Sequence, residues 1–225
     1  DPAQIREIFD AISYNKGGSV LPMLEHHLGE ETFRQGLRSY IALHQYRNAR
    51  TEDLWSALSE ASEQPVSAIM GSWTRQMGYP LLTVRRAGDG IELRQRRFLY
   101  DGASAAGPEP ARWTIPVTVA FQGAIEGRRQ LVEQPEATAT IPEGVELTAW
   151  VKANWGQTGF FRVDYEPENW DRLGGAVARL ELPAADRRGL VDDAYALVRA
   201  GLQPAVRFLE LAEQYRNERD ATVWG

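Results

Sequence analysis

Apolar residues recur with a helical period over the first 80 residues of the chain. The spacing i, i+3, i+4 and i+7 places four of them on one face of a helix: Ile5, Ile8, Phe9 and Ile12. The pattern continues in the stretches 21–28, 33–41, 54–61 and 66–73. In the second of these, Phe33, Leu37, Tyr40 and Ile41 are expected to form the buried face. Gly29 and Gly78 stand where helices are expected to end.

The period changes from 3.6 to 2 near residue 81. Alternating apolar positions predict strands at 82–84, 91–93, 113–121, 145–151 and 161–165. Gly88-Asp89-Gly90 separates the first two strands and is typical of a hairpin turn. Several short strands with turns between them, and without intervening helices, predict an antiparallel β-sandwich.

Helical spacing returns from Pro167 to the end of the chain. Blocks of one type in succession indicate separate domains, because each block must bury its own apolar face. The sequence therefore predicts an α+β multidomain chain. Its expected domains are a helical region at 1–80, a sandwich at 81–165 and the first helices of a further domain at 166–225.

Composition narrows the function classes. The chain has 43% hydrophobic and 25% charged residues, as expected of a folded globular protein, and no run of about eighteen apolar residues that could span a membrane. It has 25 basic and 31 acidic residues and no basic segment, which disfavours nucleic acid and anionic membrane surfaces as partners. The absence of cysteine excludes disulfides and cysteine nucleophiles. The compartment stays open, with the cytoplasm slightly favoured.

The stretch from Ile12 to Leu21 interrupts the first helical pattern with two glycines and several polar residues. One interpretation is a helix break, with Ser19 capping the next helix and Pro22 in its first turn. The other is that Gly17 and Gly18 allow a ligand to approach while Tyr14 acts as a hydrogen-bond donor.

Seven segments, in the same order along the chain, resemble one enzyme family. Residues 14–25, with the sequence YNKGGSVLPMLE, resemble the stretch that carries the catalytic tyrosine of aminopeptidase N and puromycin-sensitive-type zinc aminopeptidases. Further segments resemble the end of the family's catalytic domain, its β-sandwich and the opening of its helical C-terminal domain: 29–33, 48–55, 73–80, 154–165, 188–194 and 218–224. Pro22 and Gly18 depart from the residues usual in that family.

The resemblance implies a zinc-dependent enzyme that removes N-terminal residues from peptides. It also implies that Tyr14 donates a hydrogen bond to the oxyanion of the transition state. The helical region then corresponds to the end of a thermolysin-like catalytic domain.

The zinc ligands of such an enzyme are missing from this sequence. The site requires two histidines at i and i+4 with a glutamate between them, whereas the three histidines here are His26, His27 and His44. Adjacent histidines lie about 100° apart around a helix and cannot chelate one ion together, so all three are interpreted as surface or structural residues. The ligands are expected upstream of Asp1, and the chain alone is expected to bind no zinc and to be inactive.

The remaining candidates are interpreted as structural. Lys16 is expected to be solvated or salt-bridged, Asp192 and Asp193 are expected to face different directions on a helix, and the tryptophans are expected to anchor the core. The terminal helices are expected to expose apolar faces, through which the isolated chain self-associates. The alternative hypothesis is a free-standing binding or scaffold module; the loop at 102–110 lacks the aromatic and polar clusters that such a module shows.

Overall fold

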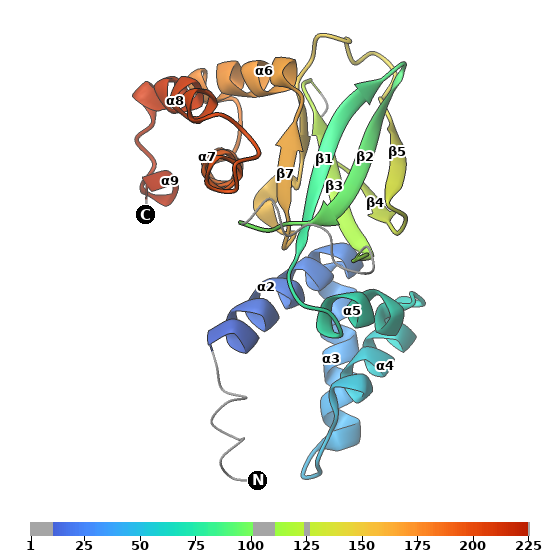
Figure 1. The fold of residues 1–225 in the computed structure, drawn as a ribbon. Coiled ribbons are helices and arrows are strands. Elements are labelled where there is room, and N and C mark those ends of the chain that lie inside the picture. Colours follow the sequence, from blue (N-terminus) through green and yellow to red (C-terminus); the bar gives the residue numbers. More distant parts are fainter. Residues whose placement is uncertain (1–10, 101–110, 124–126, 225) are drawn as a thin grey trace. The chain divides into compact units, whose positions relative to one another are not determined.

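The computed structural model describes residues 11–100, 111–123 and 127–224, with side chains from Lys16 onward within the first helix. Figure 1 traces the chain from its N-terminal helices through the strands to the C-terminal helices. Two compact units are distinguished. The first comprises Asp1–Met77 and Thr158–Phe160, and the second comprises Gly78–Gln157 and Phe161–Gly225.

The first unit is helical, as the apolar spacing predicts. Its described helices are α2 (Ala11–Leu28), α3 (Glu30–His44), α4 (Thr51–Ser62) and α5 (Val66–Thr74). Their shared core contains fully or nearly fully buried side chains from three of the four helices: Met23, Leu24, Leu58, Ile69, Met70 and Trp73. The predicted helix at residues 5–12 lies mostly outside the described residues.

Helix α2 runs without a break through Gly17, Gly18 and Ser19, so the predicted helix break is wrong. Both glycines lie within the helix, and neither has a positive φ. Pro22 lies inside the helix and cannot donate an N–H to the carbonyl four residues before it. The helix persists because Val20, Met23 and Leu24 are buried on one face, and tertiary packing outweighs weak propensity.

The turn after α2 agrees with the sequence. Gly29 has φ +87°, a conformation in which other residues are strained, and its N–H donates to the carbonyl of Glu25 at 2.8 Å. In α3, Phe33 is buried as expected, but Ile41 is 61% exposed. Ile41 lies eight residues after Phe33, which places it about 80° further around the helix and off the face that packs on α4.

The second unit contains two sheets and the C-terminal helices. One sheet has the order β5-β2-β1-β7 and the other β4-β3-β6. The strands are β1 (Pro80–Ala87), β2 (Gly90–Arg97), β3 (Ile115–Phe121), β4 (Arg128–Val132), β5 (Glu136–Thr140), β6 (Val151–Ala153) and β7 (Arg162–Tyr165). All pairs are antiparallel except β1 with β7, which is parallel. The α+β class is confirmed.

One strand is misplaced by the sequence pattern. Residues 145–150 are not extended, with a turn and bend at 147–149, and only Val151 of the predicted strand at 145–151 is in a strand, as the first residue of β6. Leu147, which the alternation places in the core, is 64% exposed. Instead the chain forms β4 and β5, whose polar sequences carry little of the alternation that identifies a strand.

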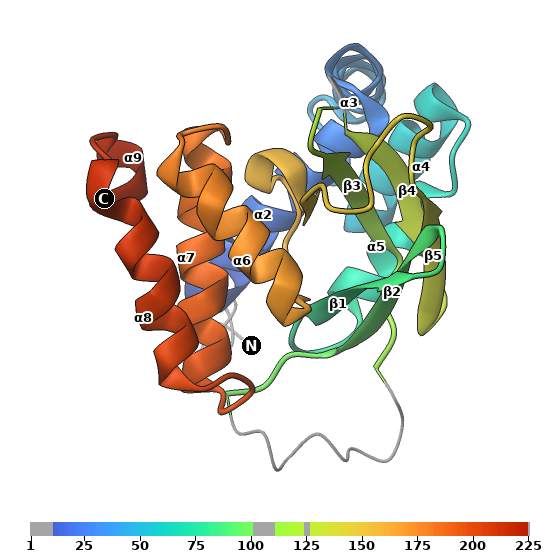
Figure 2. The same cartoon turned by 90° about the horizontal axis from the view of Figure 1, so that it is seen from above.

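The C-terminal helices are α6 (Pro167–Ala178), α7 (Ala184–Arg199), α8 (Ala205–Glu213) and α9 (Ala221–Trp224). Figure 2 shows α6, α7 and α8 packed beside one another. They belong to the same compact unit as the sheets, and α7 contacts β7 and the short 3-10 helix η2 (Trp155–Gln157). The three-domain division at residues 80 and 165 stays a prediction.

Candidate functional site

Helix α2 carries the residue that the sequence analysis singles out. The backbone of Tyr14 lies in the first turn of α2, and its side chain lies outside what the structure describes. The side chain of Lys16, two residues later, contacts a residue that is 60 positions away along the chain. Its Nζ donates to the main-chain carbonyl of Gln76 at 2.9 Å. The sequence predicts a solvated or salt-bridged ammonium, whereas the contact found here is with a main-chain carbonyl.

A cavity of about 410 Å³ lies between α2, α4 and α5. Apolar side chains form most of its lining: Val20, Leu21, Leu54, Trp55, Met70 and Trp73. Lys16, Thr51 and Thr74 contribute polar side chains to the lining. The partial burial of Lys16 lowers its pKa, because desolvation disfavours the charged ammonium.

The described residues hold no group of three histidine, aspartate or glutamate side chains arranged to bind a metal ion. His26 and His27 are half-buried on consecutive positions of α2. His44 is half-buried at the end of α3, with its ring centroid 5.2 Å from that of Tyr40. The residues present do not fit a zinc site of the aminopeptidase type.

Ionic groups are buried together in the second unit, where β6 and η2 meet α7. Lys152 and Asp186 are both fully buried, and Lys152 Nζ lies 3.2 Å from Asp186 Oδ1. The ammonium also donates to the carbonyl of Ala153 at 2.8 Å, while Asp186 accepts the N–H of Gly156 at 3.0 Å. These extra hydrogen bonds stabilise charges that burial disfavours. Desolvation nevertheless lowers the pKa of Lys152, and the negative charge of Asp186 opposes that change.

The neighbouring residues Asp192 and Asp193 face different directions, as predicted. Asp192 is exposed and lies 3.7 Å from Arg188 on the same helix. Asp193 is buried, and Arg162 of β7 lies 3.2 Å from its carboxylate. Burial raises the pKa of Asp193 to about 6, although the positive charges of Arg162 and Lys152 act in the opposite direction.

These ionic contacts connect the helix α7 to the strands, and their side chains line neither the cavity above nor the one between α6, α7 and α8. They therefore indicate an internal structural role. The sequence analysis missed Lys152, Asp186 and Arg162, because single charged residues in a strand or helix give no sign of burial. The only available signal was that β6 has apolar neighbours on both sides of Lys152.

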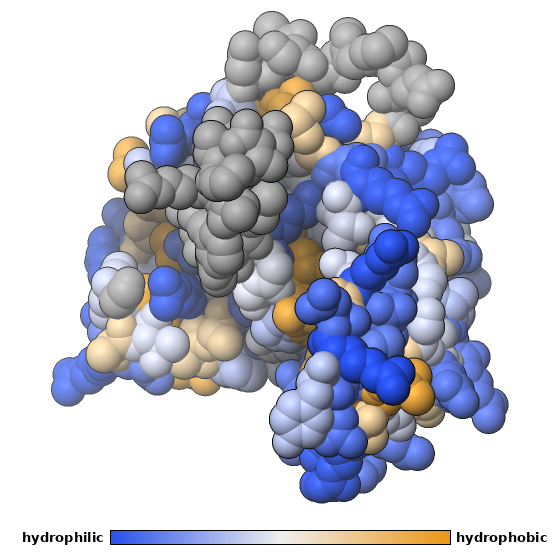
Figure 3. Space-filling view, turned by 90° about the horizontal axis from the view of Figure 1, so that it is seen from below, coloured by the Kyte–Doolittle hydropathy of each residue, from blue (hydrophilic) through white to orange (hydrophobic). Residues whose placement is uncertain are grey.

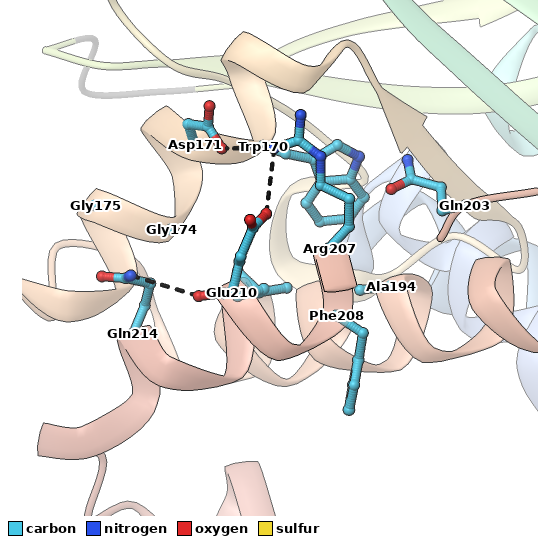
Figure 4. A pocket seen from close by; sticks show the side chains of 11 residues that line it. Trp170, Asp171, Gly174, Gly175, Ala194, Gln203, Arg207, Phe208, Glu210 and Gln214 are labelled. Atoms are coloured by element: carbon cyan, nitrogen blue, oxygen red, sulfur yellow. Dashed lines mark hydrogen bonds and ion pairs between the residues drawn. The ribbon is translucent and has the colours of Figure 1, made fainter. Parts of the chain in front are cut away.

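A second cavity of about 370 Å³ lies between α6, α7 and α8, and Figure 4 shows it from close by. Trp170 and Phe208 contribute aromatic surface to its lining. Arg207 lies 3.1 Å from Asp171 and 3.5 Å from Glu210, so its charge is matched by carboxylates of the same cavity. Gln203 donates to Asp164, outside the lining, at 2.6 Å. These polar groups are therefore already engaged within the protein.

Two other sequence expectations can be compared with the structure. The tryptophans 55, 73, 113, 150 and 170 are buried, as expected of core anchors, whereas Trp224 is 61% exposed and is not one. The loop at 102–110, which bears on the scaffold alternative, lies outside the described residues.

None of the described helices is long and apolar enough to cross a membrane.

Two family models match the chain at its ends. Residues 1–73 match the Peptidase family M1 domain, and residues 150–225 match the ERAP1-like C-terminal domain. The first match contains the stretch with Tyr14, and the second contains the buried ionic groups of α7.

Curated relatives match along the whole chain. Aminopeptidase M1-A of Oryza sativa subsp. japonica is 42% identical over 98% of this chain and 25% of its own length. Puromycin-sensitive aminopeptidase of Caenorhabditis elegans is 40% identical over 100% of this chain and 24% of its own length. Human glutamyl aminopeptidase is 36% identical, covering 99% of this chain and 24% of its own length. The chain spans about a quarter of the length of these relatives.

Proposed function

Because this chain belongs to the M1 peptidase family, we propose that it is a segment of a zinc-dependent aminopeptidase that removes N-terminal residues from peptides. In this proposal the segment comprises the end of the catalytic domain, the β-sandwich and the first helices of the C-terminal domain. Zinc is held by residues elsewhere in the longer protein, since this sequence has no pair of histidines at i and i+4.

The observation that carries the proposal is the stretch from Tyr14 to Leu21. It lies within the part of the chain that matches the Peptidase family M1 domain, and it forms one unbroken helix despite two glycines. A helix places successive residues at fixed positions, so a tyrosine on it can be held in a defined place beside a substrate.

Tyr14 has a definite chemical role in this proposal. Hydrolysis of a peptide bond passes through a tetrahedral intermediate whose oxygen carries a negative charge. A phenol O–H donates a hydrogen bond that becomes stronger as this charge develops, and loss of one such donor costs about 3 kcal/mol of transition-state stabilisation.

The test is Tyr14→Phe in the full-length protein. We expect kcat for an aminoacyl chromogenic substrate to fall by about 100-fold or more, because only the transition-state donor is removed. Zinc content, measured by elemental analysis, should stay unchanged. A variant with the kcat of the wild type would show that Tyr14 is not the donor.

The isolated chain of 225 residues is expected to be inactive and to bind no stoichiometric zinc. One tyrosine cannot generate the nucleophile that hydrolysis requires. Metal analysis and an aminopeptidase assay of the purified chain test this expectation. Turnover that a chelator abolishes would contradict it.

We also propose that the isolated chain self-associates through apolar side chains of its terminal helices. Leu43 is 72% exposed at the end of α3, and Leu209 is 61% exposed on α8. The face in Figure 3 does not carry one large apolar patch: its hydrophobic residues form separate small groups among hydrophilic ones. Light scattering over a concentration series tests the proposal; a molar mass that stays at 25.2 kDa would reject it.

A further inference from the structure

The first turns of α2 are weak as an isolated helix. Gly17 and Gly18 each cost about 1 kcal/mol relative to alanine, and a methyl group at either position would meet no atom within 4 Å. Pro22 cannot donate an N–H to the carbonyl of Gly18, which removes one further hydrogen bond. The position of the turn that carries Tyr14 must therefore depend on contacts outside the helix.

Lys16 makes such a contact two residues from Tyr14. Its Nζ donates at 2.9 Å to the main-chain carbonyl of Gln76, a residue 60 positions away along the chain. Gln76 follows directly after Arg75, the C-cap residue of α5. Its carbonyl lies just beyond the end of α5, where the partial negative charge of the last helical carbonyls also favours a nearby ammonium group.

The end of α5 is itself well fixed. Thr74 Oγ1 donates to the carbonyl of Met70 at 2.9 Å, and Gln76 Nε2 donates to the carbonyl of Ser72 at 2.6 Å. Trp73 of the same turn is fully buried. Lys16 thus connects a weak helical turn to a rigid one within the same compact unit, as the neighbouring positions of α2 and α5 in Figure 1 allow.

We propose that Lys16 is a positioning residue for Tyr14: its ammonium group, bound to the Gln76 carbonyl, holds the turn of α2 from which Tyr14 acts. The inference rests on the proposed function, because it assumes that Tyr14 donates to the transition state. It assigns Lys16 no contact with substrate. A displacement of about 1 Å in a catalytic group can reduce the rate about 100-fold, so this hydrogen bond can affect catalysis without touching the substrate.

The experiment is a double-mutant cycle in the full-length protein with Lys16→Met and Tyr14→Phe. Methionine keeps an unbranched side chain of similar length and removes the charged donor. We expect Lys16→Met to lower kcat about 10-fold or more while KM changes less than about 3-fold. In the Tyr14→Phe background the same substitution should have no further effect, because Lys16 acts through the Tyr14 hydroxyl.

A general structural role predicts a different result. A loss of stability or of active protein would lower kcat by the same factor in both backgrounds, and such additivity would overturn the inference. The control is Arg38→Met, which removes one positive charge from an exposed position of α3 and should keep the kcat of the wild type. A Lys16→Met protein with the same kcat as this control would also overturn the inference.

Lys16→Arg decides the question if Lys16→Met does not fold. Arginine keeps the charge, so the protein should fold, but its longer, planar guanidinium group cannot donate to the Gln76 carbonyl without displacing the turn of α2. The kcat should therefore be reduced with Tyr14 present and not reduced further with Phe at position 14. Equal reductions in both backgrounds, or none in either, would reject the proposal. If Tyr14→Phe itself keeps the kcat of the wild type, the proposed function fails; if only the Lys16 variants keep it, this inference alone fails.

Discussion

The carboxylate of Asp193 joins α7 to β7 through two contacts. Its Oδ1 atom lies 3.2 Å from Nη1 of Arg162, and its Oδ2 atom accepts the main-chain N–H of Val163 at 3.2 Å. The group is buried, so its ionisation and the packing of α7 on the sheet depend on each other.

This relationship predicts a specific dependence of stability on pH. The pKa of Asp193 rises from 3.8 to about 6 on folding, because burial disfavours the charged carboxylate. Between these values the folded state binds more protons than the unfolded state, so the contribution of Asp193 falls as pH rises from about 4 to 6. Across this range the free energy of unfolding should fall by about 3 kcal/mol at most.

Asp193→Asn mimics the neutral acid and provides the test. We expect the wild type to lose stability relative to this variant as pH rises from 4 to 6, with a constant difference above pH 7. Urea unfolding of both proteins at a series of pH values measures the difference. A difference that is flat, or that changes in the opposite direction, would contradict the assignment.

Glu218 predicts a change of the opposite sign at lower pH. Arg187 donates to both of its carboxylate oxygens, with 3.0 Å from Nη2 to Oε1, and these hydrogen bonds lower the pKa of Glu218 from 4.5 to about 2. The stabilisation is therefore complete above pH 4.5 and is lost as pH falls toward 2. The wild type should lose its advantage over Glu218→Gln across this window. An advantage that persists at pH 2 would show that the ion pair is not its source.

The sequence reveals elements whose burial follows a simple period. Phe33, Trp73 and Val84 lie in the core where the helical and alternating patterns place them. The pattern fails at residues whose burial does not follow the apolar period. Leu147 fits the alternation but lies in an exposed turn, and Lys152 is charged yet fully buried. Only the folded chain brings Lys152 to Asp186, 34 positions away, so no local rule could identify that pair.

The role proposed for Tyr14 follows from the residues around it in the sequence, but the contact of Lys16 with Gln76 could not be inferred from them. That contact depends on the end of α5 lying beside α2, which is a property of the tertiary structure. The break predicted at Gly17 and Gly18 was wrong for the same reason: burial of Val20 and Leu24 keeps the helix continuous.

The buried pair of Lys152 and Asp186 predicts strong coupling between two substitutions. Lys152→Met leaves Asp186 charged and buried without its cation, which costs about 3–5 kcal/mol in comparable cases. Asp186→Asn leaves the ammonium without its carboxylate. We expect the double variant to be less destabilised than the sum of the two single variants by at least about 1 kcal/mol. Urea unfolding of all four proteins measures this difference, and strict additivity would show that the two groups do not interact.

The final prediction compares two glycines in adjacent helices. A Cβ atom at Gly36 of α3 would lie 2.7 Å from Leu58 Cδ2 and 3.1 Å from Leu58 Cα, so α3 or α4 must move to accept it. Alanine favours the helix by about 1 kcal/mol, but overpacking a core costs about 1–3 kcal/mol, and the backbone contact leaves little room for relief. Gly36→Ala should therefore destabilise the protein.

Gly18→Ala is the matched control, since its methyl group enters open space and should stabilise the protein by up to about 1 kcal/mol. Thermal unfolding of the two variants should show shifts of opposite sign. Equal shifts would mean that the packing of α3 on α4 does not require glycine at position 36.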